Sequence, residues 1–166
     1  MLKIAADSCS NITIAEAKEL GIELIPLTIN FDDESYLDEV EMSKKEFYER
    51  LVASRTMPKT SQPCPSFFED LFTRAKESGD EVLFISLSSK LSGTYQTAVQ
   101  AKERVGYGGV YVYDSEQVGE CVAFLVLEAL KYKDLPAKEV IAKLDELKKR
   151  VRVYAVIDTL EYLHRG

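Results

Sequence analysis

The chain has 166 residues, about the length of one domain, and at this size roughly 70% of the unfolded surface can be buried. Hydrophobic residues make up 46% and charged residues 30%, a balance that is typical of globular proteins and excludes a disordered chain. The formal net charge of −7 argues against a nucleic-acid partner, because neutralising phosphates requires a basic surface. The same charge disfavours docking on an anionic membrane.

The cysteines and the apolar runs indicate the compartment. Cys9, Cys64 and Cys121 are far apart and lack metal-ligand spacing, which suits a reducing environment. Asp7 comes too early for a signal peptide, and the longest apolar run, residues 121–127, is much shorter than the ~20 residues needed to cross a bilayer. We expect a cytoplasmic protein without membrane insertion.

The first elements alternate between strand and helix. Residues 2–6 predict a short buried strand. Thr13 and Glu16 have the spacing of a capping box and predict a helix that ends at Gly21. Residues 22–31 form the next extended run.

Two further capping pairs follow. Ser43 with Glu46, and Ser66 with Glu69, each predict the start of a helix. The segment between these helices, residues 56–65, contains three prolines and is predicted to be a loop.

The second half of the chain continues the alternation. Strands are predicted at residues 82–87, 110–113 and 151–157. Helices are predicted at residues 94–104, 119–132 and 136–150. Strands separated by helices indicate parallel pairing with helices on both sheet faces, so residues 1–166 are predicted to form one α/β domain.

Hydroxyl groups gather where the predicted strands end. Asp7 and Ser8 follow the first strand, residues 88–94 follow another, and Asp114 and Ser115 follow a third. Ligands of open parallel sheets bind beyond the carboxyl ends of the strands, although serine and threonine at helix starts also serve as simple caps.

Three residues in this group open a helix. The amino end of a helix offers unpaired N–H groups and attracts anions, and here it would carry the hydroxyls of Ser92 and Thr94, with Gly93 allowing close approach. The loop at residues 60–63 adds further hydroxyls.

The ligand class follows from what the motifs lack. The chain has neither a GxxxxGK[ST] phosphate loop nor a GxGxxG fingerprint, and Lys59 and Lys90 are the only cations in these loops. A singly charged carboxylate fits this site better than a polyphosphate. We expect no cofactor and no metal.

Catalysis has little support in the sequence. His164 is the sole histidine, and Cys9 is better explained as a small buried thiol than as a nucleophile. Asp7 and Asp114 could form an acid/base pair or hold Mg²⁺, but orienting the neighbouring serines is the better reading. The nearly all-apolar helix at residues 119–130 indicates buried core, with the lining of an apolar cavity as the alternative.

Taken in order, these motifs resemble the DegV family along the whole chain. The matching segments are D-S-x-S-N-I, T-S-Q-P-x-P, S-S-x-L-S-G-T-Y-Q, D-S and T-L-E-Y-L-x-x-G, at residues 7–12, 60–65, 88–96, 114–115 and 159–166. The T-S-Q-P and S-G-T segments are specific. Departures from the family pattern are Cys121 and Ala123, which replace glycines.

The resemblance implies an α/β amino-terminal domain and a long-chain fatty acid as ligand. It implies that Thr60 and Ser92 bind the carboxylate, that Gly93 and Thr94 add N–H donors, and that a fatty acid kinase phosphorylates the carboxyl that this acyl carrier presents. The supporting residues would be Asp7, Ser8, Ser61, Asp114 and Ser115.

A second, carboxyl-terminal domain is also implied, and we expect it to be absent from this chain, either because the chain is a fragment or because the rest is a separate chain. Its absence predicts exposed apolar surface beside residues 92–94 and around Tyr162 and Leu163. Two other functions stay open at this point: a dihydroxyacetone-kinase-like enzyme subunit, which would need His164 in its site, and an interaction module without a ligand.

Overall fold

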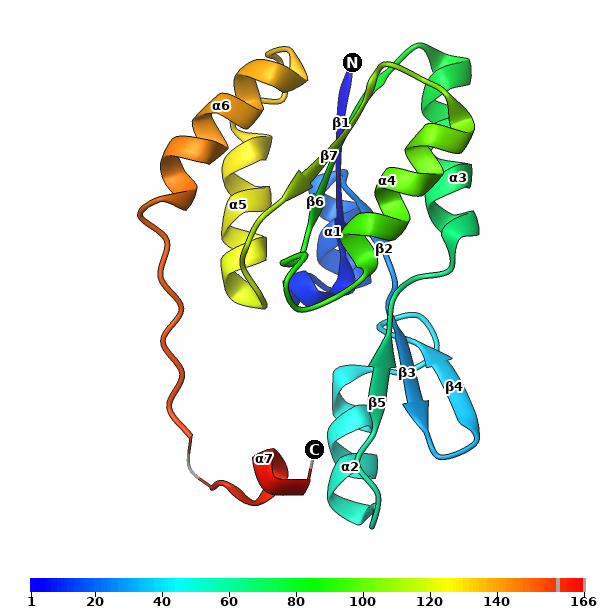
Figure 1. Ribbon diagram of the computed structural model, residues 1–166, viewed down its shortest axis with the longest axis vertical. Helices are drawn as coiled ribbons and strands as arrows, with labels where there is room; N and C mark the ends of the chain where they lie inside the picture. Colours follow the sequence, from blue (N-terminus) through cyan, green and yellow to red (C-terminus); the bar gives the residue numbers. More distant parts are fainter. Residues whose placement is uncertain (158, 166) are drawn as a thin grey trace.

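A parallel sheet forms the centre of the computed structural model, which describes residues 1–157 and 159–165 (Figure 1). Four strands pair in the order β2-β1-β6-β7, and all three pairings are parallel. The strands are β1 (Leu2–Asp7), β2 (Glu23–Ile25), β6 (Glu81–Ser86) and β7 (Val110–Asp114). The predicted α/β fold with a mainly parallel sheet is confirmed.

Helices cover both faces of this sheet. They are α3 (Pro65–Ser78) and α4 (Thr94–Val105) on one face, and α1 (Ile14–Leu20), α5 (Glu120–Leu130) and α6 (Ala137–Lys148) on the other. Alternate residues of β6 point to opposite faces of the sheet. Phe84 packs edge-on against Phe68 of α3, with ring centroids 5.0 Å apart, and Leu83 packs in the core on the side of α5 and α6. Burial on both faces explains why β6 is a continuous apolar run.

A second, antiparallel sheet is not indicated by the sequence pattern. It has the order β4-β3-β5, with β3 (Thr28–Phe31), β4 (Glu34–Leu37) and β5 (Lys59–Ser61). The extended run at residues 22–31 divides near Pro26, which lacks an N–H donor, so that β2 joins the large sheet and β3 the small one. Part of the predicted loop at residues 56–65 is therefore strand β5.

The small sheet and α2 (Lys44–Ala53) form a compact part of the chain, residues 28–61, which we call the small unit. Figure 1 shows the small unit below the parallel sheet, at the end where β1 and β6 terminate. The small unit therefore faces the edge of the sheet where the sequence places the hydroxyl groups.

All three predicted helices are present, and the predicted amino-terminal cap is confirmed in two of them and wrong in the third. Thr13 and Glu16 form a reciprocal capping box, and the Ser43 hydroxyl accepts a hydrogen bond from the N–H of Glu46. Ser66 is not a cap, because α3 already begins at Pro65, whose fixed φ suits the first helical position.

The predicted last strand at residues 151–157 is wrong. The segment pairs with no strand among the described residues and runs from α6 toward α7 (Glu161–Arg165), away from the parallel sheet (Figure 1). Its side chains are largely exposed, with Tyr154 at 91% and Val156 at 95%. β-propensity alone does not make a strand: the segment must also lie along a free edge, and it does not pair with β7, an edge strand of the parallel sheet.

The expected exposure of apolar surface beside residues 92–94 and around Tyr162 is met in part. Leu91, beside residues 92–94, is 65% exposed, whereas Tyr162 is half-buried. The side chain of Leu163 and residue Gly166 lie outside the described part. No helix of the described residues has both the length and the apolar character needed to span a membrane.

Candidate functional site

A cavity of about 1050 Å³ lies between the small unit and the carboxyl end of the parallel sheet. Ser8 and Cys9 after β1, and Leu87 after β6, form part of its wall, together with Ser92 and Gly93 at the start of α4. The small unit contributes the opposite wall, which includes Leu27, next to β3, and Ile29, Phe47, Tyr48, Thr60 and Ser61. The cavity is at the upper end of the size range of small-molecule sites and combines apolar walls with a few hydroxyls.

Thr60 and Ser92 line this same cavity, one from each wall. Thr60 is in β5, opposite Ile29 in the antiparallel ladder, so the small sheet sets its position. Gly93 and Ser61 also line the cavity, and Ser61 accepts a hydrogen bond from Asn30 Nδ2 at 3.3 Å.

The Ser92 hydroxyl can donate to a ligand in one of the two directions that its bond with Thr94 allows. Its oxygen accepts the N–H of Thr94 at 3.2 Å and lies 2.9 Å from the Thr94 hydroxyl. When the Thr94 hydroxyl donates, both lone pairs of Ser92 Oγ are used and its proton is left for an acceptor. Thr94 itself is fully buried, so the structure places it behind Ser92.

The two walls meet closely at Gly93. A Cβ at this position would lie 2.0 Å from Gln62 Oε1, so the Gln62 carboxamide lies directly against the glycine. The group that approaches Gly93 closely is therefore the Gln62 side chain. Gln62 also lines the cavity, and the sequence analysis missed it as a site residue.

Asp7 lies beneath the site and is completely buried. Its Oδ2 accepts the Leu87 N–H at 2.8 Å and thus ties the end of β1 to the end of β6. Its Oδ1 has no hydrogen-bond partner among residues 1–157 and 159–165. Burial raises the pKa of this carboxyl from 3.8 to about 7, against the opposing effect of the Leu87 N–H.

Ser8 joins the two walls of the cavity. Its hydroxyl accepts the buried N–H of Leu27 at 3.0 Å, next to the start of β3. This bond connects the first strand end of the parallel sheet with the small unit.

Asp114 and Ser115 support the loops and do not line the cavity. Asp114 Oδ1 accepts the N–H groups of Ser89 at 3.1 Å and Glu116 at 3.0 Å, and the Ser115 hydroxyl accepts the N–H of Gln117 at 3.0 Å. Because β6 separates β1 from β7, Asp7 and Asp114 are two strand spacings apart, roughly 9–10 Å. That separation favours the reading of two loop-fixing acids over a direct acid/base pair.

The cation of the cavity is Lys44, which the sequence analysis missed. Its Nζ donates to the Asn11 carbonyl at 2.7 Å and is 3.9 Å from Glu39 Oε1. Lys44 lies in the first turn of α2, outside the strand-end loops, so only the docking of the small unit brings it to the cavity.

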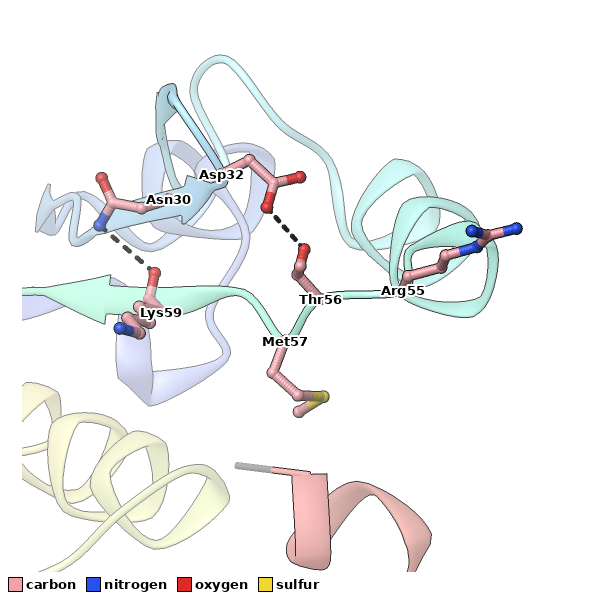
Figure 2. Close-up of a pocket in the computed structure, with 6 residues that line it drawn as sticks. All are labelled: Asn30, Asp32, Arg55, Thr56, Met57 and Lys59. Carbon is pink, nitrogen blue, oxygen red and sulfur yellow. Dashed lines mark hydrogen bonds between the residues drawn. The ribbon is translucent and has the colours of Figure 1, made fainter.

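Lys59 lines a separate hollow of about 490 Å³, and Lys90 is not among the lining residues of the large cavity. In Figure 2, Thr56 Oγ1 donates to Asp32 Oδ1 at 2.7 Å, and Asn30 Nδ2 donates to the Lys59 carbonyl at 3.3 Å. The Arg55 guanidinium extends away from Lys59 in the same view. The cations of this hollow do not converge on one point.

The remaining candidates are not placed for catalysis at the cavity. Cys9 lines it, but burial raises the pKa of its thiol and disfavours the nucleophilic thiolate. His164 is exposed on α7 and does not line the cavity. Helix α5 packs Val122, Leu125 and other apolar residues, including Ala123, into the core of the sheet, but its Phe124 and Leu127 are exposed, so the buried-core prediction is met for one face of the helix only.

The sequence matches a family model over residues 1–166, described as "Uncharacterised protein, DegV family". A DegV domain-containing protein of Halalkalibacterium halodurans is 41% identical over 168 residues, which cover 99% of this chain and 59% of the relative. The chain thus spans about three fifths of the curated relatives that it matches.

Solved structures agree with this assignment. DegV from Bacillus subtilis, a fatty acid binding protein, superposes with a TM-score of 0.82 at 32% identity, covering 89% of this chain and 54% of that one. A stearic-acid-binding protein from Eubacterium ventriosum gives a TM-score of 0.81 at 28% identity, covering 87% and 52%. The order of the motifs, the α/β fold and these relatives together show that the chain belongs to the DegV family.

Proposed function

We propose that this chain binds a long-chain fatty acid through its carboxylate. Ser92 and Thr60 donate their hydroxyls to the carboxylate, Gly93 allows its approach to the amino end of α4, and Thr94 supports Ser92 from behind. The apolar wall formed by Leu27, Ile29 and Phe47 takes part of the acyl chain. This role is binding and not catalysis.

The observation that carries the proposal is the convergence on one cavity. Two hydroxyls from segments 32 positions apart in the sequence, Thr60 and Ser92, line it beside a helix amino end and an apolar wall. A carboxylate with a long apolar tail satisfies both kinds of surface, whereas a polyphosphate would face Asp38 and Glu120 with Lys44 as the cation. Fatty acids in related DegV proteins support the same ligand class.

The test is mass spectrometry of lipid extracted from the purified chain, followed by palmitate titration of the delipidated protein. We expect co-purified fatty acid and saturable binding. A chain that carries no lipid and binds no palmitate would contradict the proposal.

Replacing Ser92 by alanine should weaken palmitate binding by about 0.5–1.5 kcal/mol, because one ordinary hydrogen bond to the carboxylate is lost. Thr60→Val should have an effect of similar size. Ser89→Ala is the matched control, since Ser89 is exposed, follows the same strand and does not line the cavity. Unchanged affinity in both Ser92→Ala and Thr60→Val would remove these residues from the carboxylate site.

We further propose that the chain acts as an acyl carrier in the cytoplasm and presents the carboxyl to a fatty acid kinase. The family resemblance supports this role, and three free thiols suit a reducing compartment. With the kinase and MgATP, loaded carrier should yield acyl phosphate, which hydroxylamine traps as a hydroxamate. Equal yield from free fatty acid without the carrier would contradict the carrier role.

A second domain, as in the family resemblance, completes the acyl pocket in this proposal. Curated relatives are longer than this chain, and the segment at residues 153–157 exposes its apolar side chains. A chain extended by the family's carboxyl-terminal domain should bind palmitate more tightly than residues 1–166. Equal affinity of the two would show that the second domain does not enclose the acyl chain.

A further inference from the structure

Gln62 occupies the point where the two walls of the cavity meet. Measured from the position that a Cβ would take on Gly93, Gln62 Oε1 is at 2.0 Å, its Cδ at 3.1 Å and its Nε2 at 3.8 Å. The carboxamide oxygen, and not the nitrogen, therefore faces the glycine. Any side chain at position 93 would push this oxygen away.

An acceptor oxygen suits this place. Gly93 is the residue that precedes α4, a helix of 12 residues. The N–H groups of its first turn have no carbonyl four residues earlier to bond, and the positive end of the helix dipole attracts oxygen. Gln62 thus places a neutral amide oxygen beside the amino end of α4. The proposed function places the charged carboxylate oxygen of the ligand at this same position.

The side chain is free to leave this position. Gln62 is exposed, so moving it opens no cavity in the core. Thr60, two residues earlier, is held in the β5 ladder, so Gln62 can swing without carrying Thr60 away from the cavity.

We propose that Gln62 is an internal competitor of the ligand carboxylate: it rests its amide oxygen over Gly93, must be displaced when a carboxylate binds, and returns to speed release. The inference rests on the proposed function and deepens it. A carrier that has to deliver its ligand gains from a side chain that takes the place of the departing carboxylate.

Palmitate titration of Gln62 variants tests the competition. Gln62→Ala should bind palmitate about 2- to 10-fold more tightly, with slower dissociation, because the amide oxygen no longer occupies the place beside Gly93 that the carboxylate takes. Gln62→Glu should bind at least about 10-fold more weakly, since a charged competitor holds the helix end more strongly. Gln100→Ala, an exposed glutamine further along α4, is the control and should leave the affinity unchanged. Weaker or unchanged binding by Gln62→Ala would overturn the proposal.

A second measurement separates this inference from the proposed function. Without fatty acid, Gln62→Ala should shift the NMR amide signals of Tyr95 and Gln96. No shift would show that the contact is absent. If the wild-type chain binds no palmitate, the proposed function fails on that result, and acetate titration then tests the competition alone. Equal acetate affinity of wild type and Gln62→Ala would overturn it.

Discussion

Replacing Asp7 by asparagine is expected to remove a large pH dependence from the stability of this protein. Folding raises the pKa of the Asp7 carboxyl from 3.8 to about 7, because the folded chain buries it. Between these pH values the folded state holds a proton that the unfolded chain has lost. The contribution of this group is therefore fully present below pH of about 4 and falls as the pH rises to about 7.

The expected size is on the order of 4 kcal/mol, from about three pKa units at 1.36 kcal/mol each. The measurement is the free energy of unfolding in urea at pH values from 4 to 8 for wild type and Asp7→Asn. The difference should grow in favour of asparagine as the pH rises and level off above about pH 7. Asp114→Asn, at the end of β7, is the control for exchanging a strand-end aspartate, since Asp114 is only partly buried. Parallel curves for wild type and Asp7→Asn would contradict the prediction.

Ser8→Ala should destabilise the fold by about 1–3 kcal/mol, because the buried N–H of Leu27 loses its acceptor. The lost hydrogen bond is one that connects the parallel sheet to the small unit. Amide protons of β3, such as that of Ile29, should therefore exchange faster with solvent than those of β6.

Urea unfolding with circular dichroism measures the stability, and hydrogen exchange measures the local effect. Ser89→Ala should change the stability by less than about 0.5 kcal/mol, as expected of an exposed hydroxyl. If Ser8→Ala costs no more than this control, the Ser8–Leu27 bond does not hold the small unit.

Local signals in the sequence determined most of the main sheet and its helices. Thr13 with Glu16, and Gly21 in the left-handed region at φ 69, set the bounds of α1 through bonds between neighbours in the sequence. The apolar run of β6 predicts a strand buried on both faces, and the T-S-Q-P and S-G-T segments predict the family. These signals act within a few residues, so they can be read without a structure.

Other features depended on contacts between distant segments. The run at residues 22–31 reads as one strand, but Pro26 and the partners available on each side divide it between two sheets. Residues 151–157 have strand-like composition and still remain unpaired, although β7 is an edge strand, because pairing requires the segment to run alongside that edge. Hydrogen bonding between strands is a property of the pair and not of either sequence.

In the candidate site, too, some residues could be predicted from the sequence and others only from the tertiary structure. The sequence alone placed Ser92 and Gly93 at a helix start beyond a strand end, and it named Thr60 from its motif. Lys44 was missed because a lysine in a helix turn carries no local signal of function. Gln62 is part of the T-S-Q-P segment, but the segment by itself gives the glutamine no role. Only the docking of the small unit brings Lys44 to the cavity and lays the Gln62 carboxamide on Gly93, since these contacts join segments more than 30 residues apart.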